Sequence, residues 1–313
     1  MNKLTVSSSP HIRSVDTTQR IMLDVVIALM IPAIAGTVIY GLGALLVIVT
    51  CILFAVLAEF IFNIAVKKPQ TVSDLSAVVT GLILALNLRA DAPLWQCALG
   101  SVFAIVVVKC LFGGLGCNFA NPAVTARIFL LICFTGTLSG GATPTIPAAD
   151  AELVSGATPL SVLENGGDLP SLIDMLLGLR GGAIGESCII AIVIGFIYLV
   201  IRRVIHFETP LIFVATVFVL SLIVDNSFTT ALYQILSGGL VFGAVFMATD
   251  YVTTPITRAG KMVFAFGCGV ITFLIRYFGS YPEGVSFAIL LMNILSPYIE
   301  KWTAKRPLGG KKA

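Results

Sequence analysis

The sequence predicts an all-α integral membrane protein with about ten transmembrane helices in two inverted repeats of five. Three observations support this prediction: the composition, the length of the apolar runs and the placement of the positive charges. Of the 313 residues, 58% are hydrophobic and 11% are charged, whereas about a quarter of a soluble domain is charged. The lysines and arginines stand at the ends of apolar runs and form no basic stripe, which indicates a lipid bilayer and no nucleic-acid partner.

The apolar runs divide the chain into ten candidate spans, since one crossing of the hydrocarbon core needs about 20 residues. The third and fifth runs are short or carry polar ends, so these two are expected to be partial or tilted helices. The ten candidate spans are residues 21–40, 42–66, 74–89, 94–112, 121–138, 184–202, 209–225, 231–248, 261–278 and 283–300.

Lysine and arginine counts orient these spans, because cytoplasmic loops collect positive residues. With the N-terminus inside, the outer side keeps only Arg89, Arg180 and Arg276, and both termini are cytoplasmic. Lys109 and Arg127 are expected near the inner helix ends, where long side chains can reach the interface. No signal-peptide pattern precedes the first span. The resulting divisions are a cytoplasmic segment 1–20, a first repeat 21–138, an outward-facing loop 139–183, a second repeat 184–300 and a basic cytoplasmic tail 301–313.

Five spans in each half force the second half to run upside down relative to the first. Two sequence matches at equivalent positions support this repeat. In the third spans, residues 81–85 (GLILA) match residues 239–243 (GLVFG). Between the fourth and fifth spans, Lys109 with a following Phe-Gly-Gly matches Arg276 with a following Phe-Gly-Ser. Inverted repeats of this kind bind substrates and ions near the membrane midplane.

Four acidic residues stand in or beside the predicted spans, where an ionised carboxylate is costly and therefore has a partner or faces a cavity. Asp24 and Glu59 lie inside the first and second spans, and each is read either as part of an ion path or as an interhelical hydrogen-bonding group. Asp250 and Glu283 lie beside breaks containing proline and glycine, where they could coordinate a cation or cap a helix.

Other cofactor motifs are weak. The seven cysteines stand singly and form no close pair of the kind that zinc or iron–sulfur ligation uses, so we expect packing roles and no metal site. The glycine-rich stretch 113–116 follows a membrane helix and has no βαβ frame, which argues against dinucleotide binding by this chain.

The outward loop contains Ser155, Gly156, Ala157 and Thr158, followed by a proline. Small residues beside a hydroxyl allow a large phosphate-bearing group to approach the backbone closely. Alone, such a stretch is most often a simple turn.

Together with four other motifs, this stretch resembles the NqrB/RnfD family, over nearly the whole chain. The other motifs are 113–123 (GGLGCNFANPA), 185–187 (GES), 246–255 (FMATDYVTTP) and 281–293 (YPEGVSFAILLMN). Family members are membrane subunits of ion-pumping, flavin-containing oxidoreductases. The short segment before the first span is more similar to the RnfD branch than to the NqrB branch, which usually has a longer extension.

The resemblance implies that Thr158 carries FMN through a phosphoester bond that an exported flavin transferase installs, which agrees with an outward loop. It also implies a second, non-covalent flavin, riboflavin. Asn118 and Asn121 could bind its ring edge, or they could cap the fifth helix at Pro122. The implied complex lies in the bacterial cytoplasmic membrane and transfers electrons between ferredoxin and NAD, coupled to Na+ or H+ transport. The docking of ferredoxin and NAD would then fall to other subunits.

Two competing interpretations remain at this stage. The inverted arrangement also resembles urea-transporter-like folds, so the chain could be a channel or transporter for a small polar solute. It could also be a structural subunit with an unmodified Thr158. A solute channel has no need of an acceptor threonine in its outer loop, so the state of Thr158 separates these functions.

Overall fold

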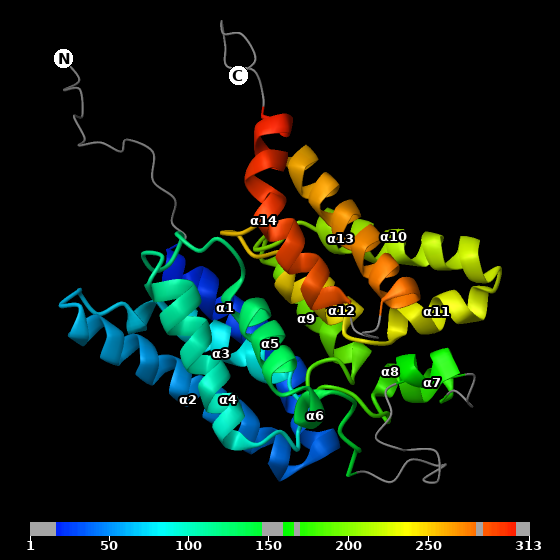
Figure 1. Cartoon of the computed structure of the whole chain (residues 1–313), viewed down its shortest axis with the longest axis horizontal. Coiled ribbons are helices and arrows are strands. Elements are labelled where there is room, and N and C mark those ends of the chain that lie inside the picture. The colour runs from blue at the N-terminus through cyan, green and yellow to red at the C-terminus, as the bar shows by residue number, and fades with distance from the viewer. Residues whose placement is uncertain (1–16, 146–158, 166–169, 280–283, 305–313) are drawn as a thin grey trace, which may run out of the picture.

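The computed structural model describes residues 17–145, 159–165, 170–279 and 284–304. Within these ranges the structure is helical, and its β structure is limited to one isolated bridge between Ala142 and Gly182. The helices of the two predicted repeats form two groups. In Figure 1, α1 to α5 lie on one side of the molecule and α9 to α14 on the other.

The first group contains five main helical elements. They are α1 (Thr18–Tyr40), α2 (Leu42–Ala65), α3 (Ser76–Leu86), α4 (Leu94–Val102) with its π-helical continuation η2 (Phe103–Cys110), and α5 (Pro122–Cys133). A short 3-10 helix, η1 (Val72–Asp74), precedes α3, and α6 (Thr135–Leu138) follows α5. Local signals set several ends: the Thr17 hydroxyl accepts a hydrogen bond from Arg20 N at the start of α1, and Gly41 ends that helix at a φ of 73°.

The second group repeats this order. It contains α9 (Ile189–Ile201), α10 (Glu208–Asp225), α11 (Phe228–Leu236) followed by α12 (Leu240–Phe242) and π-helical η4 (Gly243–Met247), α13 (Arg258–Phe278) and α14 (Val285–Thr303). Between the groups lie two short helices, α7 (Pro159–Asn165) and α8 (Leu172–Leu177), so the region predicted as a loop has secondary structure of its own.

All ten predicted spans contain a helix, but the helices differ in their ability to cross a membrane. Among the described residues, α1, α2, α10 and α13 are long and apolar enough, and the bent pair of α11 with α12 and η4 makes a fifth. Shorter apolar helices are α3, α4 with η2, α5 and α9. Large apolar side chains such as Ile34, Val38 and Ile61 are exposed on the outer faces of α1 and α2, as a lipid-facing surface requires.

The eighth span is not the single helix that the sequence predicts over 231–248. It breaks between α11 and α12 and bends by 61°. Gly238 and Gly239 have φ values of 65° and 64°, a left-handed conformation that glycine adopts without steric cost and that ends a helix.

Equivalent helices of the two groups make equivalent contacts. The groups meet through their first helices, α1 with α9, and through their last helices, α5 with α14. Within each group the second helix packs on the third and fourth elements, as α2 does on α3 and α4 and as α10 does on α11 and α13. Two structurally equivalent halves produce this pattern, in agreement with the predicted repeat.

In both halves, a buried basic side chain on the fourth helical element hydrogen-bonds to residues at a break in the third element. Helix α3 follows Leu75 at a φ of 63°, and α12 follows Gly239 at 64°. Lys109 Nζ donates to Ser76 Oγ at the first break, whereas Arg276 Nη2 donates to the carbonyl oxygens of Ser237 and Gly238 at the second. The expected interfacial position was therefore wrong for Lys109, whose side chain turns inward to these partners and is 2% exposed, and also for Arg127, which is 5% exposed.

Candidate functional site

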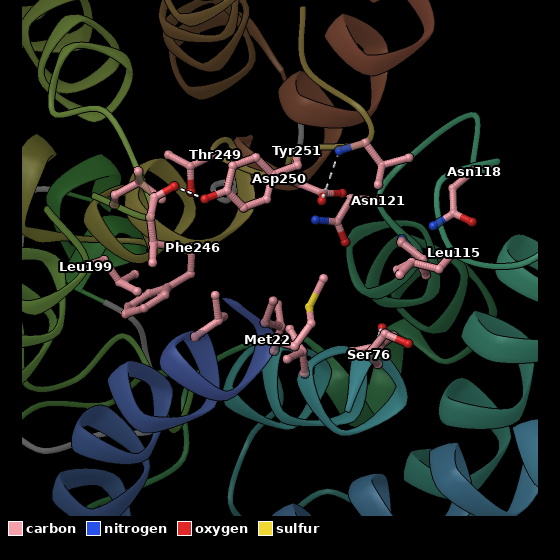
Figure 2. A pocket seen from close by; sticks show the side chains of 18 of the residues that line it. Met22, Ser76, Leu115, Asn118, Asn121, Leu199, Phe246, Thr249, Asp250 and Tyr251 are labelled. Carbon is pink, nitrogen blue, oxygen red and sulfur yellow. Dashed lines mark hydrogen bonds between the residues drawn. The ribbon is translucent and has the colours of Figure 1, made fainter. Parts of the chain in front are cut away.

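A cavity that is partly open to the surface lies between the two halves. Its walls come from α1, α3 and η2 of the first half, from the segment before α5, and from α9, η4 and the residues after η4 in the second half. Figure 2 shows Asn121 and Asp250 on one side of the cavity and Met22 on the opposite side.

The two ends of the cavity differ in polarity. Ser76 and Asn118 lie toward one end and Leu199 and Phe246 toward the other (Figure 2). Of the described residues that line the cavity, Lys109 is the one cation and Asp250 the one anion. Apolar walls with a few polar groups can hold a flat, largely apolar ligand and fix its orientation.

Asn121 and Asn118 have different roles. The Asn121 side chain caps α5 by accepting hydrogen bonds from the backbone N–H groups of Ala123 and Val124, with Pro122 at the first helical position, as the capping alternative predicts. Asn118 also lines the cavity, but its Oδ1 is buried and has no hydrogen-bond partner among the described residues. A buried amide oxygen without a donor is costly, so Asn118 is the better candidate for a ligand contact.

Glu59 forms a buried ion pair with Lys109 at the polar end of the cavity. Lys109 Nζ lies 2.9 Å from Glu59 Oε1, and both side chains are 2% exposed. The same Glu59 oxygen accepts a hydrogen bond of 2.7 Å from Thr71 Oγ1. The sequence does not reveal Lys109 as a cavity residue, because its partners Glu59 and Ser76 are 50 and 33 positions away.

Asp250 lies on the opposite wall, immediately after η4. Its carboxylate accepts hydrogen bonds from Val252 N at 3.4 Å and Thr253 Oγ1 at 3.1 Å. Burial raises the pKa of Asp250, because desolvation penalises the charged carboxylate more than these two hydrogen bonds favour it. The chain thus places one acid with a raised pKa beside the cavity.

Asp24 joins α1 to the end of α9. Its Oδ2 lies 3.0 Å from Arg202 Nη2, and its Oδ1 accepts a hydrogen bond of 2.9 Å from Tyr198 OH. This arrangement provides the interhelical partner that one of the two predicted roles requires. Asp24 also lines a separate cavity of about 410 Å³ with Arg20 and Arg203, so the ion-path role stays a prediction.

Five predicted site residues lie outside the described residues. They are Ser155, Gly156, Ala157, Thr158 and Glu283. The chain is described again from Pro159, which begins α7, and Leu160 is buried against Gly238. Arg276, which donates to the Gly238 carbonyl oxygen, therefore brings a guanidinium group to the segment that follows Thr158.

Over the described residues, the fold and the cavity define a polytopic, helical membrane protein with a cavity between its two halves. The family model of NQR2, RnfD and RnfE matches residues 5–309. The chain belongs to this NQR2, RnfD, RnfE family.

Three relatives illustrate the similarity, and each is one subunit of a larger complex. The chain is 46% identical to its relative in the Na(+)-translocating ferredoxin:NAD(+) oxidoreductase complex of Acetobacterium woodii, over 99% of this chain and 96% of that protein. It is 38% identical to its relative in the proton-translocating ferredoxin:NAD(+) oxidoreductase complex of Clostridium ljungdahlii, over 99% and 98%. It is 35% identical to its relative in the ion-translocating oxidoreductase complex of Actinobacillus succinogenes, again over 99% and 98%. These relatives confirm the predicted similarity to the RnfD branch.

Proposed function

We propose that this protein is the membrane-embedded electron-transfer subunit of an ion-translocating ferredoxin:NAD oxidoreductase complex, and that it carries FMN covalently on Thr158. The single observation that carries the first part is the similarity, over 99% of the chain, to proteins named as subunits of such complexes. Those names include both Na+ and H+, so the proposal covers a monovalent cation. The partners are the other subunits of the complex and a flavin transferase.

The segment that follows Thr158 is attached to the second half. Pro159 begins α7, and the buried Leu160 anchors this helix beside Gly238 and the Arg276 guanidinium. The proposal for Thr158 itself rests on its place in the Ser155–Thr158 motif and on the predicted outward position of this loop.

We propose that the cavity between the halves holds a second, non-covalent flavin, riboflavin. A flavin ring has apolar faces and one polar edge, and it can take up and release one or two electrons while the protein tunes its potential. Phe246 and Leu199 offer apolar surface at one end, whereas Asn118 Oδ1 offers a buried acceptor without a donor at the other. A ring N–H group would satisfy that oxygen.

In the predicted topology, the two proposed flavins lie on opposite sides of the bacterial cytoplasmic membrane. Charge counting puts the loop of Thr158 outside and both termini inside. The residues that line the cavity include Met22, Ser76 and Asp250, which lie at predicted cytoplasmic ends of their spans. Electrons that pass between the two flavins would then cross the membrane within this subunit.

Substitution of the acceptor tests the covalent site. Thr158→Ala is expected to abolish flavin fluorescence of the denatured subunit in a gel, because a phosphoester needs the threonine oxygen. The protein is expressed together with its flavin transferase, and the amount of subunit in the membrane is measured alongside.

Thr143→Ala is the matched control, since it removes an exposed threonine hydroxyl that also follows Gly-Ala and precedes a proline but lies outside the Ser155–Thr158 motif. Its fluorescence is expected to equal that of the unchanged protein. Fluorescence that persists in Thr158→Ala would refute the attachment site, and subunit that no longer inserts would refute the view that Thr158 serves only as an acceptor.

A cavity-filling substitution tests the second flavin. Val25 on α1 lines the cavity, whereas Val38 on the same helix is 63% exposed. Val25→Trp is expected to reduce the flavin that denaturation releases from the complex, because the larger side chain occupies ligand space. Val38→Trp should leave the released flavin unchanged. Equal flavin content in both variants would place the non-covalent flavin elsewhere.

A further inference from the structure

The ammonium group of Lys109 has more hydrogen-bonding capacity than its protein partners use. It donates to Glu59 Oε1 at 2.9 Å and to Ser76 Oγ at 2.6 Å. A lysine ammonium has three N–H donors and no acceptor, and no third acceptor occurs among the described residues. Lys109 also lines the cavity between the halves, so a ligand there is a candidate acceptor for the remaining N–H group.

The surrounding network holds this charge in place. Ser76 Oγ, which accepts from Lys109, donates in turn to Asp74 Oδ1 at 2.5 Å. On the other side, Thr71 Oγ1 donates to Glu59 Oε1 and accepts from Asn63 Nδ2. The lysine is therefore fixed between two acids at the wall of the cavity and cannot turn to the membrane surface without losing both hydrogen bonds.

The network is incomplete on the acidic side. Glu59 Oε2 is buried and has no hydrogen-bond partner among the described residues. A carboxylate that is paired through one oxygen only does not use its full capacity to accept hydrogen bonds. Lys109 is thus the one cation that the structure shows paired with Glu59 in the part of the chain that it describes.

The polarity of the cavity sets how a flavin would lie in it. Ser76, which bonds Lys109, and Asn118 lie toward one end, whereas Leu199 and Phe246 lie toward the other (Figure 2). The lysine supplies a donor and Asn118 Oδ1 an acceptor, which match the carbonyl oxygens and the ring N–H of the pyrimidine edge.

We propose that Lys109 is a cofactor-binding residue that contacts the pyrimidine edge of the flavin in this cavity and raises its reduction potential, with Glu59 as the opposing charge. This inference rests on the proposed flavin site. A reduced flavin carries more electron density at this edge than an oxidised one, and a fixed positive charge in a low-dielectric site stabilises that density. Glu59 offsets part of this effect, so the two residues act on the potential with opposite signs.

Redox titration of the purified complex, followed by flavin absorbance, tests the proposal. In Lys109→Met the component assigned to the non-covalent flavin should titrate at a lower potential, by at least a tenfold change in the equilibrium constant for two-electron reduction, or about 30 mV. Lys109→Arg keeps the charge and should titrate close to the unchanged complex. Glu59→Gln should shift the same component to a higher potential.

Removal of one partner of a buried ion pair can prevent folding, so a fourth variant combines Glu59→Gln with Lys109→Met. This double variant removes both charges of the buried pair. Its non-covalent flavin should titrate at a lower potential than in Glu59→Gln alone. These opposite shifts are not expected from a purely structural role. Unchanged potentials in Lys109→Met, Glu59→Gln and the combined variant, with full flavin content, would overturn the proposal.

The flavin content of Val25→Trp shows whether a negative result concerns only the role of Lys109 or the proposed flavin site in the cavity. If Val25→Trp retains all of its non-covalent flavin, the cavity is not the flavin site and the proposed function of the cavity fails. If Val25→Trp loses flavin while the Lys109 and Glu59 variants titrate as the unchanged complex does, only the role of Lys109 fails.

Discussion

At the scale of single residues, the two acids inside the first spans differ in what surrounds them. Glu59 and Lys109 are both 2% exposed, so removal of one leaves the other charge in a largely dehydrated site without its ion-pair partner. Asp24 is paired with Arg202, whose side chain is 38% exposed. Loss of Asp24 therefore leaves a cation that solvent can still stabilise.

Stability measurements should separate these two environments. Glu59→Gln is expected to lower the free energy of unfolding by about 3–5 kcal/mol, because it strands a buried ammonium group. Asp24→Asn should cost about 1 kcal/mol or less, in the range of a solvent-exposed ion pair. Denaturation in detergent measures both, and a larger loss in Asp24→Asn would contradict the burial that distinguishes the pairs.

Ion transport is the functional test of the same two acids. If either carboxylate lies on the ion path, Asp24→Asn or Glu59→Gln lowers transport in membrane vesicles more than it lowers flavin content. Equal loss of transport and flavin would instead indicate a folding defect and remove that residue from the ion path.

At the scale of elements, close backbone approaches determine how the helices meet. A Cβ atom at Gly36 on α1 would lie 2.6 Å from both Ile184 Cγ2 and the Ile184 carbonyl oxygen. A Cβ atom at Gly185, the residue after Ile184, would be similarly close to Leu86 at the end of α3. The segment between α8 and α9 is thus held against α1 and α3 through glycine contacts.

Two identical substitutions test this packing. Gly36→Ala is expected to lower the melting temperature, because the methyl group forces the Ile184 backbone away and overpacking costs about 1–3 kcal/mol. A Cβ atom at Gly136 in α6 would have no neighbour within 4 Å. Gly136→Ala should therefore be neutral or slightly stabilising, because alanine favours helix. Equal melting temperatures for both variants would argue against a close α1–Ile184 contact.

The sequence predicts the elements better than it predicts their breaks. Long apolar runs locate all ten helical segments, because hydropathy is a local property that survives in any helix arrangement. The break at Gly238 and Gly239 and the inward turn of Lys109 depend on partners far along the chain. Asn121 with Pro122 is a local capping signal, and the sequence predicts this cap correctly.

At the scale of the whole molecule, the pairing of α1 with α9 and of α5 with α14 places the cavity between two equivalent halves. The sequence indicates the repeat through matches at 81–85 and 239–243, but it cannot reveal the cavity, which forms from residues contributed by both halves. The orientation of the molecule in the membrane follows from charge counting and stays a prediction.

Cysteine labelling of intact cells tests that orientation. In a background in which the exposed Cys117 and Cys133 are replaced by Ser, Ser171→Cys in the outward region should react with an impermeant maleimide. Lys68→Cys, between α2 and α3, is also exposed but should react only after the membrane is opened. The reverse pattern would contradict cytoplasmic termini and an outward Thr158.

The central claim is that this protein carries a covalent flavin on Thr158, and the intact mass of the purified chain tests it most directly. Protein made with its flavin transferase present should show an added mass equal to FMN less water, and a peptide map should place it on the peptide that contains Ser155 to Leu160. An unmodified threonine in that material would contradict the claim and favour a channel or transporter for a small polar solute.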